Sequence, residues 1–267
     1  MENTTYIVIS NTQLALAALL LLINIGLSVV LRLGLGRDLL VGAVRMTVQL
    51  ALVGLVLEWV FQTKQPLIIV MMALVMATLA GVAAVQRTSR RFPGVYWNSL
   101  VMISASAFLV TGAAITGILQ VDTWYDPQYL IPLLGMVLGN ALTGISLGLD
   151  RMMEGCVRNR NWIETMLSHG ASRWEAAHDE IRQALRTGMI PTVNAMMIMG
   201  IVSLPGMMTG QILAGAAPLD AVRYQMVIMF MIAACTALAT LGVVLLAYRM
   251  LFSGDHRLMS SRIADKK

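Results

Sequence analysis

Seven long apolar stretches constrain this chain more than any other feature of its sequence. A helix of about 20 apolar residues spans a bilayer, because each residue adds about 1.5 Å to a path of about 30 Å. The seven predicted spans cover residues 12–33, 39–61, 66–86, 98–119, 129–149, 189–214 and 222–249. The runs are continuous rather than alternating, so the sequence predicts an all-α, polytopic membrane protein and not a β-barrel.

The composition excludes a water-soluble globular protein. Of the 267 residues, 58% are hydrophobic and only 12% are charged, whereas a soluble domain is about 25% charged. Cys156 and Cys235 are too few and too far apart to predict a disulfide framework or a metal cluster. No basic residue precedes the first apolar stretch, so we expect that stretch to remain in the mature protein.

The basic residues predict the orientation of the spans. Sixteen arginines and lysines lie in connections on the side of the C-terminus, whereas only Lys64 and Arg223 lie on the other side. Because such residues are retained in the cytoplasm, the sequence predicts an outside N-terminus and a cytoplasmic C-terminus. The basic excess is therefore a topology signal, and no nucleic-acid partner is expected.

One long polar stretch, residues 150–188, separates the fifth and sixth predicted spans. Within it, residues 161–169 predict a short helix that ends at Gly170, because glycine tolerates a positive φ. Ser172 and Glu175 then have the spacing of a capping box, which predicts a second helix leading into the sixth span. We interpret the stretch as a cytoplasmic helix-turn-helix, with a solvated loop between spans as the alternative.

Familiar catalytic motifs are not convincing in this sequence. No lysine follows a glycine, so a phosphate-binding loop ending in Gly-Lys-Ser/Thr is absent and ATP hydrolysis by that route is not expected. The segment from Gly144 to Gly148 matches the letters of a nucleophile elbow, but it lies in an apolar helix and no histidine lies in a span. These glycines, like Gly135 and Gly139, are better explained as small residues that let another helix approach closely.

Three of the polar residues within the predicted spans are candidates for a functional role. Arg45 costs at least about 2.5 to 3.5 kcal/mol at the centre of a bilayer, and Gln49 lies one turn deeper on the same helix face. The pair either lines a translocation path, or Arg45 anchors the helix by extending to the interface. Asn140 forms either a hydrogen bond between helices or a substrate contact.

The sixth predicted span contains Leu204, Pro205 and Gly206, which together predict a kink or a break. Broken helices in transporters serve as hinges or ligand sites, because their freed backbone groups need a polar cavity. A functional bend lining the path is the favoured interpretation, and a simple proline kink is the alternative.

Methionine is abundant, with 21 residues, and several surround this bend, including Met207 and Met208. Thioethers prefer soft ions such as Cu(I), whereas Fe(II) favours imidazole, carboxylate and oxygen ligands. The spans hold no histidine or aspartate for a firm iron site, so adaptable packing explains these methionines better than metal ligation.

Longer gapped motifs carry a resemblance to a known family. Its motifs in this chain are Glu164-xxx-Ser168-x-Gly170-Ala171-Ser172, Ile131-Pro132, Gly135-Met136-xx-Gly139-Asn140, Ile190-Pro191-Thr192-Val193, Gly200-Ile201-Val202-Ser203-Leu204-Pro205-Gly206-Met207-Met208, Tyr224-Gln225 and Arg45-xxx-Gln49. The chain resembles the FetB-like family of ABC transporter permeases, whose bacterial members are linked with iron export and whose plant relatives are linked with aluminium tolerance. The match covers most of the chain and is densest from residue 131 to 230.

This resemblance implies a single transmembrane permease domain, residues 1–267, with a coupling region at about 150–188. It implies a transport subunit rather than an enzyme, in a bacterial inner membrane, exporting a metal ion with iron as the first expectation. A separate ATP-binding cassette subunit would bind ATP and Mg, and the permease would work as a homodimer. An ATPase-independent channel or secondary transporter is the alternative.

The resemblance also implies roles for particular residues. The residues expected to couple the permease to the ATPase are Glu164, Ser168, Gly170, Ala171, Ser172 and Glu175. The residues expected to line the translocation path are Arg45, Gln49, Asn140, Leu204, Pro205, Gly206, Met207 and Met208. No cofactor is expected in this chain, and no metal ligands are assigned.

Overall fold

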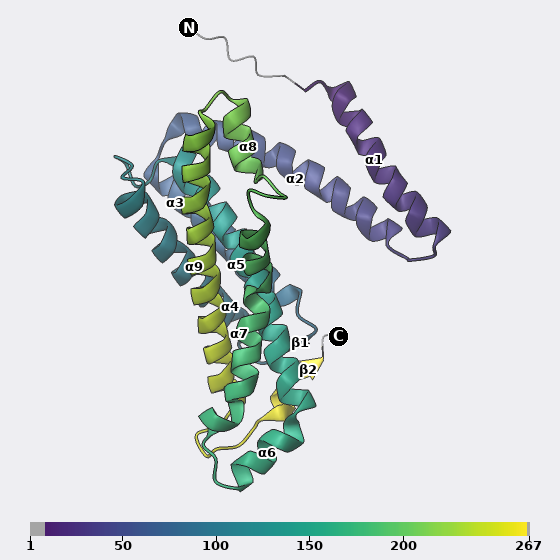
Figure 1. Ribbon diagram of the computed structural model, residues 1–267, viewed down its shortest axis with the longest axis vertical. Coiled ribbons are helices and arrows are strands. Elements are labelled where there is room, and N and C mark those ends of the chain that lie inside the picture. The colour runs from purple at the N-terminus through teal and green to yellow at the C-terminus, as the bar shows by residue number, and fades with distance from the viewer. Residues whose placement is uncertain (1–8, 266–267) are drawn as a thin grey trace.

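The computed structural model describes residues 9–265, which form an almost entirely helical molecule (Figure 1). The helices of this part of the chain are α1 (Asn11–Val30), α2 (Gly36–Thr63), α3 (Pro66–Gln86), α4 (Val95–Ala113), α5 (Pro127–Arg158), α6 (Arg160–Ser168), α7 (Arg173–Ile198), α8 (Gly206–Leu213) and α9 (Pro218–Leu251). Shorter elements are the π-helical η1 (Ala114–Ile118), the 3-10 helix η2 (Ser260–Arg262) and two paired strands, β1 (Arg90–Arg91) and β2 (Ala264–Asp265). The predicted all-α membrane fold is confirmed.

Within residues 9–265, six helices are long and apolar enough to cross a membrane, namely α1 to α5 and α9. They correspond to six of the seven predicted spans; α3 has the predicted bounds, and the other five helices have shifted ends. The predicted span 189–214 is not one helix. It is divided among the end of α7, an irregular segment at 199–205 and α8. The predicted break is therefore confirmed, whereas the predicted number of seven spans is wrong for the described residues, because the break divides this stretch and leaves no single helix there that is long and apolar enough to cross a membrane.

The chain nevertheless makes a further passage along the bundle through α7. This helix runs from α6 toward the opposite end of the molecule, packed against both α5 and α9 (Figure 1). Helix α5 has 32 residues and is about 48 Å long, which exceeds the thickness of a hydrocarbon core. We name the end of the molecule that carries α6 the α6 end.

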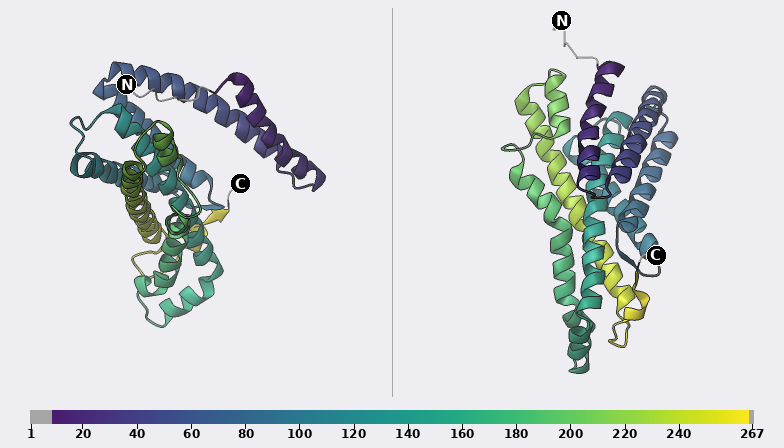
Figure 2. Two further views of the ribbon diagram at one scale, coloured as in Figure 1. Left: turned by 45° about the horizontal axis from the view of Figure 1, so that its top comes forward. Right: turned by 90° about the vertical axis from the view of Figure 1, so that its right-hand side faces the viewer.

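Helices α5 and α9 lie at the centre of the bundle, and α3, α4 and α7 pack around them. The hairpin of α1 and α2 is set apart from this bundle, as Figure 1 and the left view of Figure 2 show. Its side chains are mostly exposed in the single chain, and the buried residue of α2 is Val60 near its C-terminal end. The molecule therefore has a packed five-helix body and a separate two-helix arm.

Candidate functional site

The α6 end carries the helix-turn-helix that the sequence predicts. Gly170 has a φ of +90° between α6 and α7, a conformation that side-chain-bearing residues rarely adopt. Ser172 caps α7, and its hydroxyl and backbone N–H reach the carboxylate of Glu175 at 2.7 and 2.8 Å in a complete capping box. The Ser172 hydroxyl, and then its backbone N–H, lower the pKa of Glu175 below the ordinary value of 4.5. The turn is a defined structure rather than a flexible loop.

The other residues expected to couple to an ATPase lie on the outside of this turn. Glu164 forms an ion pair with Arg160 one helical turn earlier, at 2.7 Å. The Ser168 hydroxyl donates to the carbonyl of Thr165 at 2.8 Å near the C-terminal end of α6. Ala171 lies in the turn itself, beside Gly170. The fold thus gathers these residues at one end of the molecule, and their contact with an ATP-binding subunit stays a prediction.

A buried polar cluster joins α5 to α7 directly behind this turn, and sequence reasoning did not identify it. Glu180 is only 4% exposed. It accepts from Arg151 of α5, with a distance of 3.2 Å between Arg151 Nη1 and Glu180 Oε2, and from the side-chain amide of Asn159. Arg151 also donates to Gln183. A buried carboxylate needs such partners, because removing one partner of a buried ion pair costs about 3–5 kcal/mol.

Gly155 makes room for this cluster on α5. A Cβ atom at this position would collide with the carboxylate of Glu180 and would also meet Arg151. The signal that could have revealed the cluster was the acidic residue among small apolar residues on one face of α7, at Ala177, Glu180 and Ala184. Its partners on α5 could not be found from spacing alone.

The C-terminal tail supports the first turn of α7. The backbone N–H of Arg173 donates to His256 Nδ1 at 2.9 Å. Trp174 packs edge-on against Tyr248 of α9, with ring centroids 5.7 Å apart. The beginning of α7 is therefore held both by its own cap and by the tail.

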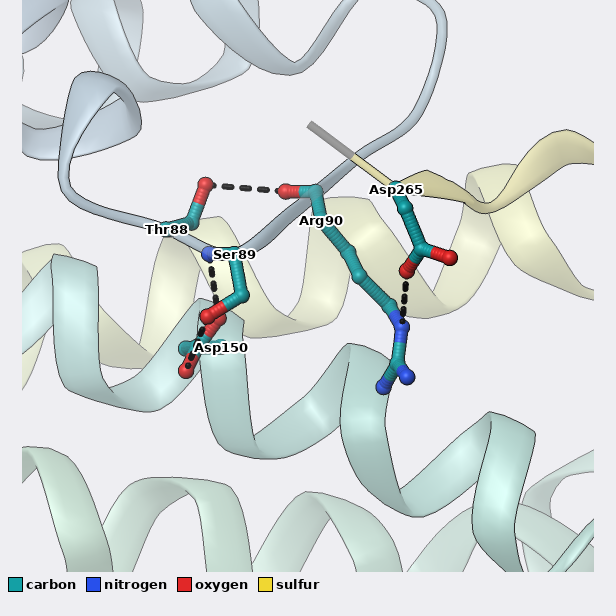
Figure 3. Close-up of polar contacts among 5 residues, drawn as sticks. All are labelled: Thr88, Ser89, Arg90, Asp150 and Asp265. Atoms are coloured by element: carbon teal, nitrogen blue, oxygen red, sulfur yellow. Dashed lines mark hydrogen bonds and ion pairs between the residues drawn. The ribbon is translucent and has the colours of Figure 1, made fainter. Parts of the chain in front are cut away.

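The connection between α3 and α4 is tied to the same region. The backbone N–H of Ser89 donates to Asp150 Oδ1 at 2.7 Å, and Arg90 Nε lies 2.9 Å from Asp265 Oδ1 (Figure 3). The hydroxyl of Thr88 donates to the carbonyl of Arg90 at 2.8 Å and shapes this connection. Three parts of the chain, namely the connection between α3 and α4, the C-terminal half of α5 and the C-terminal tail, thus meet at this place.

Further along the bundle, α5, α7 and α9 cross at closest approach through small residues. A Cβ atom at Gly188 of α7 would lie 2.7 Å from the carbonyl oxygen of Gly144 and 2.7 Å from Cγ2 of Thr240. Gly148 also faces Thr240. The prediction that Gly144 and Gly148 admit another helix is confirmed. For Gly139 the prediction is wrong within the single chain, because a Cβ atom there would have no neighbour within 4 Å. A Cβ atom at Gly135 would meet only the side chain of Met76, at 3.3 Å.

Beyond this crossing, α7 ends at a break in the chain. The N–H of Met199 still donates to Ala195, whereas the N–H groups of residues 201–203 all return to the carbonyl of Ile198. Gly200 has a φ of +83°, and Pro205 caps α8 from an extended conformation. Leu204 and Gly206 are exposed, Pro205 and Met207 are partly buried, and Met208 is buried against α9.

The remaining residues expected on the path are not brought together with this break. Arg45 and Gln49 lie on the exposed surface of α2, in the two-helix arm. Asn140 lies on the exposed face of α5, and its amide donates to Met136 in the same helix at 2.8 Å. The amide of Asn140 thus bonds within α5, and both interpretations of this residue, a bond between helices or a substrate contact, stay predictions. The path therefore stays a prediction.

Comparisons with known proteins place the chain in a group of membrane proteins. The Uncharacterised protein family (UPF0014) matches residues 11–252. The UPF0014 membrane protein slr1647 of Synechocystis sp. is 39% identical over 227 residues, covering 85% of this chain and 88% of that protein. The Probable iron export permease protein FetB of Escherichia coli is 31% identical over 258 residues, covering 97% and 98%. The Protein ALUMINUM SENSITIVE 3 of Arabidopsis thaliana is 27% identical over 246 residues, covering 92% and 89%. No solved structure matches this chain.

Proposed function

The chain belongs to the UPF0014 family, and we propose that it is the permease subunit of an ABC-type exporter that moves a metal ion out of the cytoplasm. In this proposal it is a multi-pass protein of a bacterial inner membrane, with an outside N-terminus and a cytoplasmic α6 end. The chain itself is not an enzyme. A separate ATP-binding subunit binds ATP and Mg and docks on the helix-turn-helix.

The observation that carries this proposal is the continuity of α7 from the capped turn to the break. One helix of 26 residues connects Ser172 at the α6 end with Met199 at the irregular segment. Its start is fixed by the capping box and by the buried Glu180 cluster, and its middle is held by the glycine crossing at Gly188. A push on the turn is therefore transmitted as a rigid-body movement to the break, as a coupling element requires.

Metal-ion export is proposed from the names of the relatives. FetB of Escherichia coli is named a probable iron export permease, and a relative from Arabidopsis thaliana is named for aluminium sensitivity. Iron is therefore the first cargo to test. The match covers 98% of FetB, so the comparison rests on almost the whole of that protein.

A permease homodimer completes the proposal. Arg45 and Gln49 on α2 and Asn140 on α5 are exposed in the single chain, where lipid would surround them. Polar side chains facing lipid are costly, and they are usually turned toward a protein interior or a water-filled cavity. A second copy that covers these faces would place them in such an interior.

The test uses two variants of the turn with side chains of similar size that differ in their tolerance of positive φ. Gly170→Val cannot hold the left-handed turn without strain, whereas Gly170→Asn is expected to keep it. The readouts are pull-down of the ATP-binding subunit and iron-stimulated ATP hydrolysis in reconstituted vesicles. We expect Gly170→Val to lose at least about tenfold in stimulation, and Gly170→Asn to retain it.

Two results would contradict the proposal. One is that no ATP-binding subunit is retained by the wild-type chain while iron still crosses vesicles that contain the chain alone, which would favour a channel or a secondary transporter. The other is full association and stimulation in both Gly170→Val and a variant lacking residues 162–169. In that case the turn would be a connection between helices and not a coupling surface.

A further inference from the structure

A cavity of about 370 Å³ lies at the break between α7 and α8, against α9. Five methionines contribute to its lining. Met208 and Met229 are buried and form the inner wall, Met199 is partly buried, and Met196 and Met226 lie at the exposed rim. These residues come from three separate helices and from the irregular segment, so the concentration of sulfur arises from the fold and not from one helix stripe.

One polar side chain in the lining lacks a partner. Gln225 of α9 is only 7% exposed, and its Oε1 atom is buried with no hydrogen-bond partner in the described part of the chain. A buried amide oxygen without a donor costs about 1–3 kcal/mol. In an apolar cavity, this cost is relieved when the cavity holds a hydrogen-bond donor or a cation.

The end of α7 provides a second reason for a cation. Among residues 9–265, no backbone N–H donates to the carbonyls of Met196 and Met197, because the N–H groups of Gly200 and Ile201 bond to Ser203 and Ile198 instead. The C-terminal end of a helix also carries about half a negative charge from its aligned peptide dipoles. Met196 and Gly200, on either side of the end of α7, both line the cavity. A cation there is favoured by the end of the helix.

The chemistry of the lining determines which class of cation fits. The lining residues named above carry no formal charge, and no group of three or more His, Cys, Asp or Glu side chains gathers within the described residues. A hard divalent cation such as Fe(II) favours imidazole, carboxylate and oxygen ligands, whereas thioethers select soft ions such as Cu(I). A neutral set of thioethers with an amide oxygen therefore suits a soft monovalent cation.

We propose that this methionine cavity is a binding site for a soft monovalent cation of the Cu(I) class, with Met208, Met229 and Gln225 as its inner ligands. The idea that transported ions bind at this site rests on the proposed function, because an ATPase that moves α7 would change the shape of the cavity at the end of that helix. Binding itself does not depend on an ATPase. The site thus names a substrate class different from iron.

The test measures Ag(I) binding to the full-length chain in detergent micelles, because Ag(I) mimics Cu(I) without redox chemistry. All variants carry Cys156→Ala and Cys235→Ala, so that thiols cannot bind the ion. We expect Met208→Leu with Met229→Leu, and separately Gln225→Leu, to weaken Ag(I) binding at least about tenfold, as ligand loss does at metal sites. Leucine nearly preserves the volume of methionine, so the fold should persist, and thermal unfolding checks this.

The matched control is Met197→Leu. Met197 lies on α7 beside Met196, is 73% exposed and is not among the residues that line the cavity, so this variant should bind Ag(I) like the parent. Gln225→Glu adds a carboxylate and should raise Fe(II) binding relative to Ag(I). Each of these results supports the site.

Three results would overturn the site, namely no Ag(I) binding, equal weakening in Met197→Leu and the cavity variants, or tighter Fe(II) than Ag(I) binding by the parent chain. None of them concerns the ATP-binding subunit, so the permease proposal would stand. Conversely, Ag(I) binding that depends on Met208 and Met229 would support the site even if no ATP-binding subunit associates with the chain.

Discussion

At the scale of single residues, Glu180 shows how a charge can determine the local structure of a membrane protein. Its carboxylate lies between α5 and α7 with Arg151 and Asn159 as partners, and Gly155 leaves the space that it occupies. The cluster fixes the rotation and height of α7 relative to α5, because a buried ion pair is favourable only with its partners in place. Single substitutions there should consequently change the position of the whole helix.

Gly155→Ala is predicted to destabilise the chain, because the new methyl group would occupy the position of the Glu180 carboxylate. We expect a loss of about 1–3 kcal/mol in the free energy of unfolding, as for other overpacked sites. Thermal unfolding in detergent micelles measures it. Gly139→Ala on the same helix is the control, since nothing lies within 4 Å of its Cβ position and alanine favours a helix by about 1 kcal/mol. Equal unfolding midpoints for both variants would contradict the role of Gly155.

Glu175 makes the cap of α7 sensitive to acid. Its pKa is lowered in the folded chain, so the stabilisation is present above its ordinary pKa of 4.5 and is lost as the pH falls through the folded value. We expect hydrogen exchange of the first turn of α7, corrected for intrinsic rates, to accelerate in this acidic window. Ser172→Ala removes the hydroxyl that is the main cause of the shift, so it should weaken protection at neutral pH and reduce the pH dependence. An unchanged pH dependence in that variant would refute this explanation.

At the scale of elements, α7 is one helix with two halves of different composition and different surroundings. Its first half is charged and belongs to the α6 end, whereas its second half is apolar and passes the crossing with α5 and α9 before the break. The crossing relies on Gly188, because the helices approach more closely there than any side chain would allow. Helix packing through small residues is common in membranes, where close backbone contact replaces the hydrophobic effect.

Gly188→Ala is therefore predicted to push α7 away from α5 and α9. A Cβ atom would lie 2.7 Å from a backbone oxygen, which cannot move aside as a flexible side chain could. We expect the free energy of unfolding to fall by about 1–3 kcal/mol. We also expect transport activity to decrease, because the helices at the crossing are displaced. Thermal unfolding and vesicle efflux are the measurements. Gly210→Ala on α8, where no atom lies within 4 Å, should change neither of them, and a similar effect in both variants would argue against a packed crossing.

At the scale of the whole molecule, the arm and the five-helix body raise the question of orientation. The connection between α4 and α5 and the helix α6 lie at opposite ends of α5. The basic residues predict that α6 is cytoplasmic, since they gather in the connections on its side. An odd number of passages, with α7 as the broken one, would then place the two ends of the chain on opposite sides.

Cysteine labelling tests this orientation in a chain that carries Cys156→Ala and Cys235→Ala. Asp122→Cys, in the connection between α4 and α5, should react with a membrane-impermeant maleimide added to intact cells. Trp162→Cys on the exposed surface of α6 should react only after permeabilisation. The reverse pattern would overturn the predicted orientation, and labelling of both from outside would indicate that α5, which lies between the two positions in the chain, does not cross the membrane.

The sequence by itself determined the membrane class, six of the spans, the capped turn and the break. Each of these depends on residues within a few helical turns: apolar runs of sufficient length, a glycine at positive φ, Ser172 with Glu175, and Pro205 in an apolar segment. Local composition therefore sufficed. It overstated the number of spans, because the apolar stretch 189–214 was counted as a seventh span although the break divides it between α7 and α8.

Only the tertiary structure decided which residues meet. Gly144 faces another helix and Gly139 does not, although both are glycines of α5 with the same backbone flexibility. Glu180 is buried because Arg151 and Asn159 lie 29 and 21 residues away in the chain but adjacent in space. The methionine cavity likewise requires α7, α8 and α9 to converge. Such contacts depend on the packing of distant helices, which periodicity and spacing within one segment do not encode.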